Sequence, residues 1–203
     1  NVDQINPFVQ YCLNAGAAVV PMRPVGYQTN AVILDNDDAG VAFSGAWLDS
    51  SSTIFYGSAG DTPYKYAYIA STGQSAVARY VPNLPVRGYY PVYCWTLYSG
   101  NRVRQLYRIR HTGGINEIKV NHRRVGAGWV WLGNYYFEAG TNGYVEISNY
   151  APGYNPASDV VVADAIRFGN GMGNIDRGGG VSGYEKELEA SRYWVQAMTG
   201  QGM

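Results

Sequence analysis

Residues 88–97, Gly88-Tyr-Tyr-Pro-Val-Tyr-Cys-Trp-Thr-Leu97, form the most strand-like segment of the chain. The segment is dense in aromatic and β-branched residues, which suit a pleated, half-buried surface. Turn signals bound it on both sides, at Pro82-Asn83-Leu84-Pro85 and at Ser99-Gly100-Asn101. We therefore predict that residues 88–97 form a central strand of a β-sandwich.

Short alternating segments surround this strand. Residues 102–111 and 115–123 flank Thr112-Gly113-Gly114, which predicts a β-hairpin. Residues 48–54 are rich in serine and are predicted to be a loop. Further strands are predicted at residues 32–34, 41–47, 64–68, 76–81, 129–132, 135–137, 144–148 and 159–168. Short strands at this regular spacing indicate a sandwich or a jelly roll.

The two ends of the chain have a different texture. Residues 4–15 and 184–198 carry apolar residues at helical spacing, and residues 17–22 look like a short buried strand. The predicted fold is mainly β, a jelly-roll-like antiparallel β-sandwich with short α/β flanking segments. The predicted division is a helix–strand flank at 1–30, the β-sandwich at 31–168, and a Gly-rich linker with a C-terminal helix at 169–203.

Composition excludes several functions. The 203 residues hold 15 basic and 15 acidic side chains, so the net charge is zero and nothing favours nucleic acid or an anionic membrane. No run of 18 apolar residues is present to span a membrane, and no signal peptide is visible. Because the sequence begins at Asn1, we expect a piece of a longer, processed protein. Cys12 and Cys94 lack the spacing of a metal site and are expected to be buried thiols.

Residues 31–168 resemble the golvesin C-terminal-like domain, which also occurs in xanthan lyase-like proteins. The resemblance implies an extracellular β-sandwich that is presumed to bind carbohydrate, and it supplies no ligand site. It rests on motifs that follow one another in the family's order: Leu34-Asp35-Asn36, Asp38-Ala39-Gly40, Gly45-Ala46-Trp47, Ala78 to Pro85, Gly88 to Tyr93, Trp95, Tyr107-Arg108-Ile109, His111 to Gly114, Val120-Asn121, Trp129, Leu132-Gly133, Tyr135, Phe137, and Val161 to Phe168.

The flanks resemble a different family. Residues 8–23 are similar to the helix–strand segment of zinc-dependent N-acetylmuramoyl-L-alanine amidases, in which an arginine near the active cleft would correspond to Arg23. Residues 184–198 would then be that family's next helix, with the β-sandwich inserted between them. The His, Glu and His that bind zinc in the family have no counterpart in this chain, so the resemblance implies no catalysis by these residues alone.

Two groups of residues are candidate metal ligands. His111 and His122 flank the predicted hairpin and could face each other across it, but two histidines hydrogen-bonded in or beside the hairpin are the simpler explanation. Asp35, Asp37 and Asp38 share one turn and could bind Ca²⁺ through their oxygens, or simply cap the first strand as an Asx turn.

Six residues are candidate ligand-binding residues. Aromatic rings with polar edges suit the faces of sugars. A solvated strand face is the simpler explanation for the arginines, and an anionic glycan or a partner domain is the alternative. Trp129 and Trp131 share a face by alternation, so both are expected to be buried or both exposed. The six candidates are Trp47, Tyr56, Trp129, Trp131, Arg108 and Arg110.

No nucleophile–base arrangement is present, so we do not expect an enzyme from this chain alone. The leading hypothesis is a secreted, non-catalytic module of a bacterial cell-wall or polysaccharide-acting protein, which binds carbohydrate or another cell-surface polymer. One alternative is a structural, self-assembling extracellular protein whose flanking segments make homo-oligomeric contacts. The other is a fragment of a peptidoglycan amidase whose zinc ligands lie outside residues 1–203.

Overall fold

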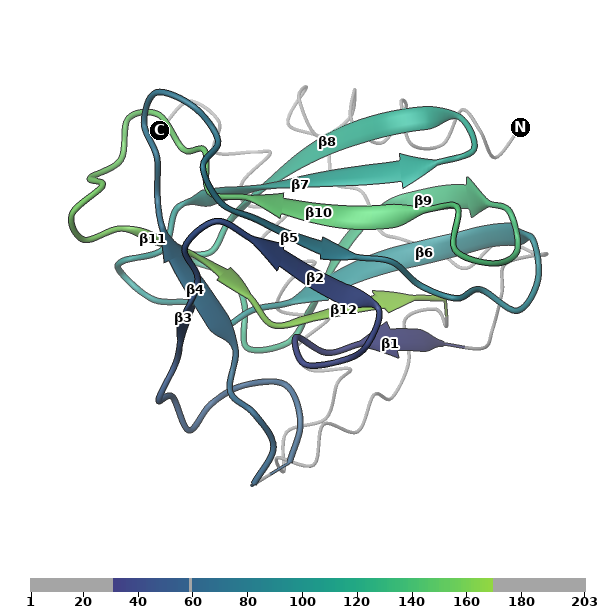
Figure 1. Ribbon diagram of the computed structural model, residues 1–203, viewed down its shortest axis with the longest axis horizontal. Coiled ribbons are helices and arrows are strands. Elements are labelled where there is room, and N and C mark those ends of the chain that lie inside the picture. Colours follow the sequence, from purple (N-terminus) through teal and green to yellow (C-terminus); the bar gives the residue numbers. More distant parts are fainter. Residues whose placement is uncertain (1–30, 59, 170–203) are drawn as a thin grey trace.

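The computed structural model describes residues 31–58 and 60–169, and within them the chain forms β-strands and no helix (Figure 1). Two antiparallel sheets pack face to face, and a smaller third sheet continues them at one end. The prediction of a mainly β, jelly-roll-like sandwich is therefore confirmed. The predicted α/β flanks lie outside the described residues. In the described part of the chain, no helix of the length and apolar character needed to span a membrane is found.

Each sheet combines strands that are far apart in the sequence. The four-stranded sheet has the order β1 (Val32–Leu34), β12 (Ala165–Phe168), β6 (Gly88–Trp95) and β9 (Trp129–Phe137). The five-stranded sheet has the order β2 (Val41–Ser44), β5 (Val77–Tyr80), β10 (Tyr144–Ser148), β7 (Arg104–His111) and β8 (Gly114–Asn121). The three-stranded sheet has the order β11 (Val160–Ala163), β4 (Lys65–Tyr68) and β3 (Leu48–Asp49).

Strand β6 has the central place that its sequence predicts. It pairs with β12 on one side and with β9 on the other, and it ends at Trp95, two residues before the predicted end. Its alternate side chains face opposite ways. Val92 and Cys94 enter the main core between the two large sheets, whereas Tyr93 and Trp95 join a second cluster on the outer face. Burial on both faces explains the continuous apolar sequence of this strand.

The predicted hairpin is formed by β7 and β8. All eight residues of each strand are paired, from Arg104 opposite Asn121 to His111 opposite Gly114. Thr112 and Gly113 are the two residues of the turn, and Gly114 follows it with a φ of 123°, a value that glycine adopts without strain. The side chains of β7 alternate between the two faces of the sheet. Tyr107 and Ile109 face the core, and the arginines face outward.

Two irregularities change which residues face the core. The segments predicted as two strand pieces at 129–132 and 135–137 form one strand, β9, with a register shift where Val92 pairs with Gly133 and Tyr93 pairs with Trp131. The extra residue switches the core-facing positions of β9 from even to odd numbers. Asp164 does the same between β11 and β12, since Ala163 and Ile166 both face the core.

The prediction of a loop over residues 48–54 is wrong at its start. Leu48 and Asp49 form the edge strand β3, in which Leu48 pairs with Tyr66 and Asp49 with Lys65. An ion pair between the Lys65 ammonium and the Asp49 carboxylate joins the two strands. A strand of two residues has too few positions to show alternation, so the sequence could not reveal it.

A buried polar network crosses the core. The Nδ1 atom of His122 lies 2.8 Å from the carbonyl oxygen of Val125, so Nδ1 carries the proton and Nε2 accepts from the Tyr107 hydroxyl at 2.7 Å. That hydroxyl accepts from Gln105 Nε2, at 2.7 Å. Gln105 also bonds both the N–H and the carbonyl of Val162, each at 2.8 Å. The network therefore links β7 to β11 and to the segment after β8.

This network makes stability depend on pH. Burial first, and the nearby charge of Arg102 second, lower the pKa of His122 from 6.5 to about 4. Because the unfolded chain binds the proton more readily, the stability due to neutral His122 is lost as the pH falls from 6.5 to 4, by up to about 3 kcal/mol. Urea unfolding of the wild type and of His122→Gln at several pH values should show the gap between them shrinking over this range. A gap that stays constant would contradict the assignment.

Candidate functional site

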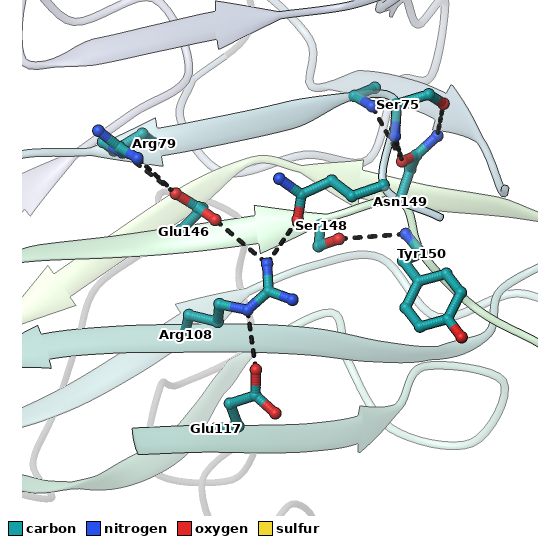
Figure 2. A network of polar contacts seen from close by, with 10 residues as sticks. Ser75, Arg79, Arg108, Glu117, Glu146, Ser148, Asn149 and Tyr150 are labelled. Atoms are coloured by element: carbon teal, nitrogen blue, oxygen red, sulfur yellow. Dashed lines mark hydrogen bonds and ion pairs between the residues drawn. The ribbon is translucent and has the colours of Figure 1, made fainter. Parts of the chain in front are cut away.

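The outer face of the five-stranded sheet carries a row of alternating charges (Figure 2). Arg79 on β5, Glu146 on β10, Arg108 on β7 and Glu117 on β8 lie next to one another across four strands. Glu146 Oε2 accepts from Arg79 Nη2 at 2.8 Å, and Glu146 Oε1 accepts from Arg108 Nη1 at 3.2 Å. Arg108 Nε donates to Glu117 at 2.8 Å. Arg108 is thus held by two carboxylates, and its Nη1 also donates to Gln74.

Glu146 is the centre of this row. It is only 6% exposed, and a buried carboxylate requires charged or polar partners. Arg79 and Arg108 supply them from both sides. The hydrogen bond from Arg79 to Glu146 in turn raises the pKa of Arg79. The row therefore has fixed geometry, whereas Arg110, two residues further along β7, is exposed on the same face.

The two predicted arginines are therefore brought to one surface, and the predicted aromatics are not. Trp129 is fully buried on the outer side of the four-stranded sheet. The ring of Tyr56 lies 5.1 Å from the ring of Trp129. The Arg167 guanidinium lies 5.0 Å from the same Trp129 ring. The prediction that Trp129 contacts a ligand is wrong, because other side chains cover its ring. Trp131 shares this cluster, as alternation predicts, and is partly buried.

Trp47 lies elsewhere. Its ring packs edge-on against Phe43 at 5.3 Å, and its Nε1 atom donates to the carbonyl of Ser44 at 3.1 Å. The Lys65 ammonium lies over the Phe43 ring, 5.7 Å from the ring centroid. Trp47 and the Tyr56 cluster therefore occupy different places and do not form one aromatic platform.

A further aromatic surface lies on β4, outside the six candidate residues. Ala67 and Ile69 face the main core, so Tyr66 and Tyr68 on β4 face outward, with ring centroids 6.1 Å apart at 77°. Tyr68 is 47% exposed, and Leu48, paired with Tyr66, is 45% exposed. We call Leu48, Tyr66 and Tyr68 the tyrosine surface. The sequence shows tyrosines alternating at positions 64, 66 and 68, but it does not show which side of the strand is exposed to solvent.

The tyrosine surface rests on a firm base. Tyr64, Val160 and Val162 are buried beside it in a separate cluster. Arg102 fixes Tyr64 by donating from Nη2 to its hydroxyl at 3.0 Å and by lying 5.6 Å from the ring. Asn149 donates from Nδ2 to the carbonyl of Tyr68 at 2.9 Å, and Figure 2 shows the bonds of Asn149 with Ser75. The surface is therefore held by side chains from three parts of the chain.

The acidic turn is a β-turn in which the N–H of Asp38 donates to the carbonyl of Asp35 at 3.1 Å, and side-chain carboxylates add further hydrogen bonds to the backbone. The N–H of Asp35 donates to the Asp38 carboxylate at 2.7 Å, and the N–H of Asn36 donates to the Asp35 carboxylate at 2.8 Å. Over residues 31–58 and 60–169, no group of three or more His, Cys, Asp or Glu side chains is placed to hold a metal ion. Asp35, Asp37 and Asp38 are therefore not grouped as three metal ligands, and calcium binding at this turn stays a prediction.

The two histidines also do not form a site together. His111 adjoins the hairpin turn, where its Nε2 contacts Asn116 at 2.6 Å and its Nδ1 accepts from Gly113 N–H at 3.1 Å. His122 follows the far end of β8, inside the buried network. The hypothesis that they face each other is wrong, because the two strands run the full length of the hairpin between them.

Asp164 is a buried carboxyl at the junction of β11 and β12. It is 1% exposed and accepts from the N–H of Tyr56 at 3.1 Å. Burial first, and the charge of Asp35 second, raise its pKa well above the usual value. The pKa of Asp35 is itself raised to about 7, chiefly by burial. The charge of Asp35 therefore opposes the ionisation of Asp164.

Asp164→Asn should stabilise the fold at high pH. A raised carboxyl pKa gives stability at low pH that is lost as the pH rises through the folded pKa, and asparagine keeps an acceptor for Tyr56 without the charge. We expect a gain of roughly 1 kcal/mol or more at pH 8, since one pKa unit corresponds to about 1.4 kcal/mol, and nearly none at pH 4. Thermal unfolding of both proteins at the two pH values tests this. A variant less stable than the wild type at pH 8 would refute it.

Comparison with known proteins agrees with this architecture. Residues 32–170 match the family described as the Golvesin C-terminal domain. Xanthan lyase from Bacillus sp. (strain GL1) is 34% identical over 151 residues, which cover 73% of this chain and 16% of that protein, so the chain spans about a sixth of its curated relative. The structure of Paenibacillus xanthan lyase matches with a TM-score of 0.59 and 31% identity, over 69% of this chain and 13% of that one.

A more distant match is CBM35 from Cellvibrio japonicus Abf62, with a TM-score of 0.46 and 14% identity over 70% of this chain and 94% of that one. Likeness at this level supports no conclusion about function. The family match covers well over half of the chain, and its limits agree with the first and last described strands, β1 and β12. The chain therefore belongs to the Golvesin C-terminal domain family.

Proposed function

We propose that this chain is a non-catalytic module that binds carbohydrate through the tyrosine surface. The observation that carries the proposal is the pair of exposed side chains Tyr68 and Leu48 on either side of the partly buried Tyr66. Sugar rings present apolar C–H faces to aromatic rings, and the tyrosine hydroxyls can meet sugar hydroxyls at the rim. Exposed apolar side chains that adjoin one another are a feature of binding surfaces.

Similarity to part of xanthan lyase supports the proposal from a different direction, because that relative is named for a polysaccharide. A module that binds such a polymer would work outside the cell, which is the location we propose. The part of the relative that this chain matches is small, and the chain would then serve to hold a larger protein on its polymer.

The test is retention of the purified chain by a panel of neutral polysaccharides, soluble ones in affinity gels and insoluble ones in pull-down assays. We expect retention by at least one of them, and competition by the matching oligosaccharide. If a folded chain is retained by none and instead forms oligomers that grow with its concentration and ignore saccharides, the self-assembling alternative replaces this proposal.

A further inference from the structure

The outward face of the five-stranded sheet is positively charged although the chain as a whole is neutral. Strand alternation places basic side chains there from three strands, against carboxylates from two. The basic residues are Arg79, Arg104, Arg108, Arg110 and Lys119, and the acidic ones are Glu117 and Glu146. Acidic residues gather instead in the turn at residues 35–38.

The carboxylates of this face are already engaged. Glu146 lies between Arg79 and Arg108, and Glu117 is paired with Arg108. Arg110 takes no part in these ion pairs. It is exposed, and within residues 31–58 and 60–169 its side chain makes no hydrogen bond, ion pair or ring contact. Its positive charge is thus available to an anion from outside.

The surroundings of Arg110 suit an anion attached to an apolar ring. Its cross-strand neighbours are Tyr144 on β10 and Ile115 on β8, neither of which is charged. Ile115 is 49% exposed, and the ring of Tyr144 is held by the Arg79 guanidinium at 4.5 Å. Arg108, fixed by its two carboxylates, lies two residues along β7, about 7 Å away.

We propose that Arg110, flanked by Tyr144 and Ile115, binds the carboxylate of an acidic saccharide, that is, of a uronic acid unit. The guanidinium fork matches a carboxylate in two parallel hydrogen bonds. The neighbouring Tyr144 and Ile115 side chains contact the C–H groups of the sugar ring. This site is separate from the tyrosine surface. That its ligand is a saccharide rather than an acidic peptide rests on the proposed function.

The experiment compares an oligoglucuronate with the same oligosaccharide after its carboxyl groups are reduced, by calorimetric titration of the full chain at low salt. We expect the acidic form to bind about tenfold more tightly, as a charge-assisted hydrogen bond predicts, and Arg110→Gln to abolish the difference. Lys119→Gln is the matched control, since it removes an exposed positive charge from the same face. It should change the affinity less than about twofold, because it lies outside the site. Circular dichroism confirms that both variants fold.

Three results would overturn the inference. One is equal affinity for the two saccharides, and another is an equal loss in Lys119→Gln, which would indicate general charge attraction. The third is binding of polyglutamate as tight and as dependent on Arg110 as that of the oligoglucuronate, which would indicate a protein partner. A chain that binds neutral saccharide without preferring the acidic one refutes only this inference, whereas a chain that binds no saccharide refutes the proposed function as well.

Discussion

Trp129→Ala should lower the free energy of unfolding by about 3 to 5 kcal/mol, the range measured for large aromatic residues deleted from cores. Trp129 is fully buried, and its removal would leave a cavity beneath Tyr56 and beside Arg167. Arg167 would lose one of the two rings that hold its guanidinium. We expect a fall in melting temperature on the order of 10 °C, measured by urea and thermal unfolding.

The matched control for this prediction is Trp131→Ala. Trp131 lies on the same side of the same strand but is only partly buried, and its Nε1 contacts Asn134 at 3.3 Å. Its replacement should cost less than half as much. If the two variants are equally stable, Trp129 is not the structural residue that its burial indicates.

The second large effect is on binding. Replacing both Tyr66 and Tyr68 with alanine should weaken the affinity for a neutral polysaccharide on the order of 30-fold, the loss expected for truncating an aromatic hot spot worth about 2 kcal/mol. Stability should change less than in Trp129→Ala, because Tyr68 is 47% exposed and Tyr66 is only partly buried, whereas Trp129 is fully buried. Affinity is measured by titration, with the folded fraction of each variant checked first.

Tyr136→Ala is the control for that result. Tyr136 is also a partly buried tyrosine on a strand, but it lies on β9 of the four-stranded sheet, against Tyr89, rather than beside β4. The variant should bind neutral polysaccharide as the wild type does. An equal loss in Tyr136→Ala and in the double variant would show that the tyrosine surface has no special role.

The parts of the fold that the sequence predicts are those in which side chains alternate over a long strand. The hairpin of β7 and β8 and the central strand β6 follow from runs of at least eight residues with clear patterns. Alternation fails where one extra residue changes the facing side chains, as at Gly133 and Asp164. It also fails for β3, which is too short to show a period.

The site was harder to predict for a physical reason. Alternation tells which side of a sheet a residue faces, but not what covers that side. Trp129 and Tyr68 both point away from the main core, yet Trp129 is covered by Tyr56, 73 positions earlier in the chain, whereas Tyr68 remains open. Such long-range contacts leave no mark on the local sequence. The pairing of Arg108 with Glu146 is of the same kind, because it depends on the order of strands.

The most direct test of the central claim is to map where a neutral oligosaccharide contacts the folded chain, by NMR titration of its amide and aromatic resonances. The account predicts that the largest shift changes fall on Leu48, Tyr66 and Tyr68, and that they saturate together with one dissociation constant. Shift changes confined to other faces of the sandwich, or none at saturating oligosaccharide, would contradict it.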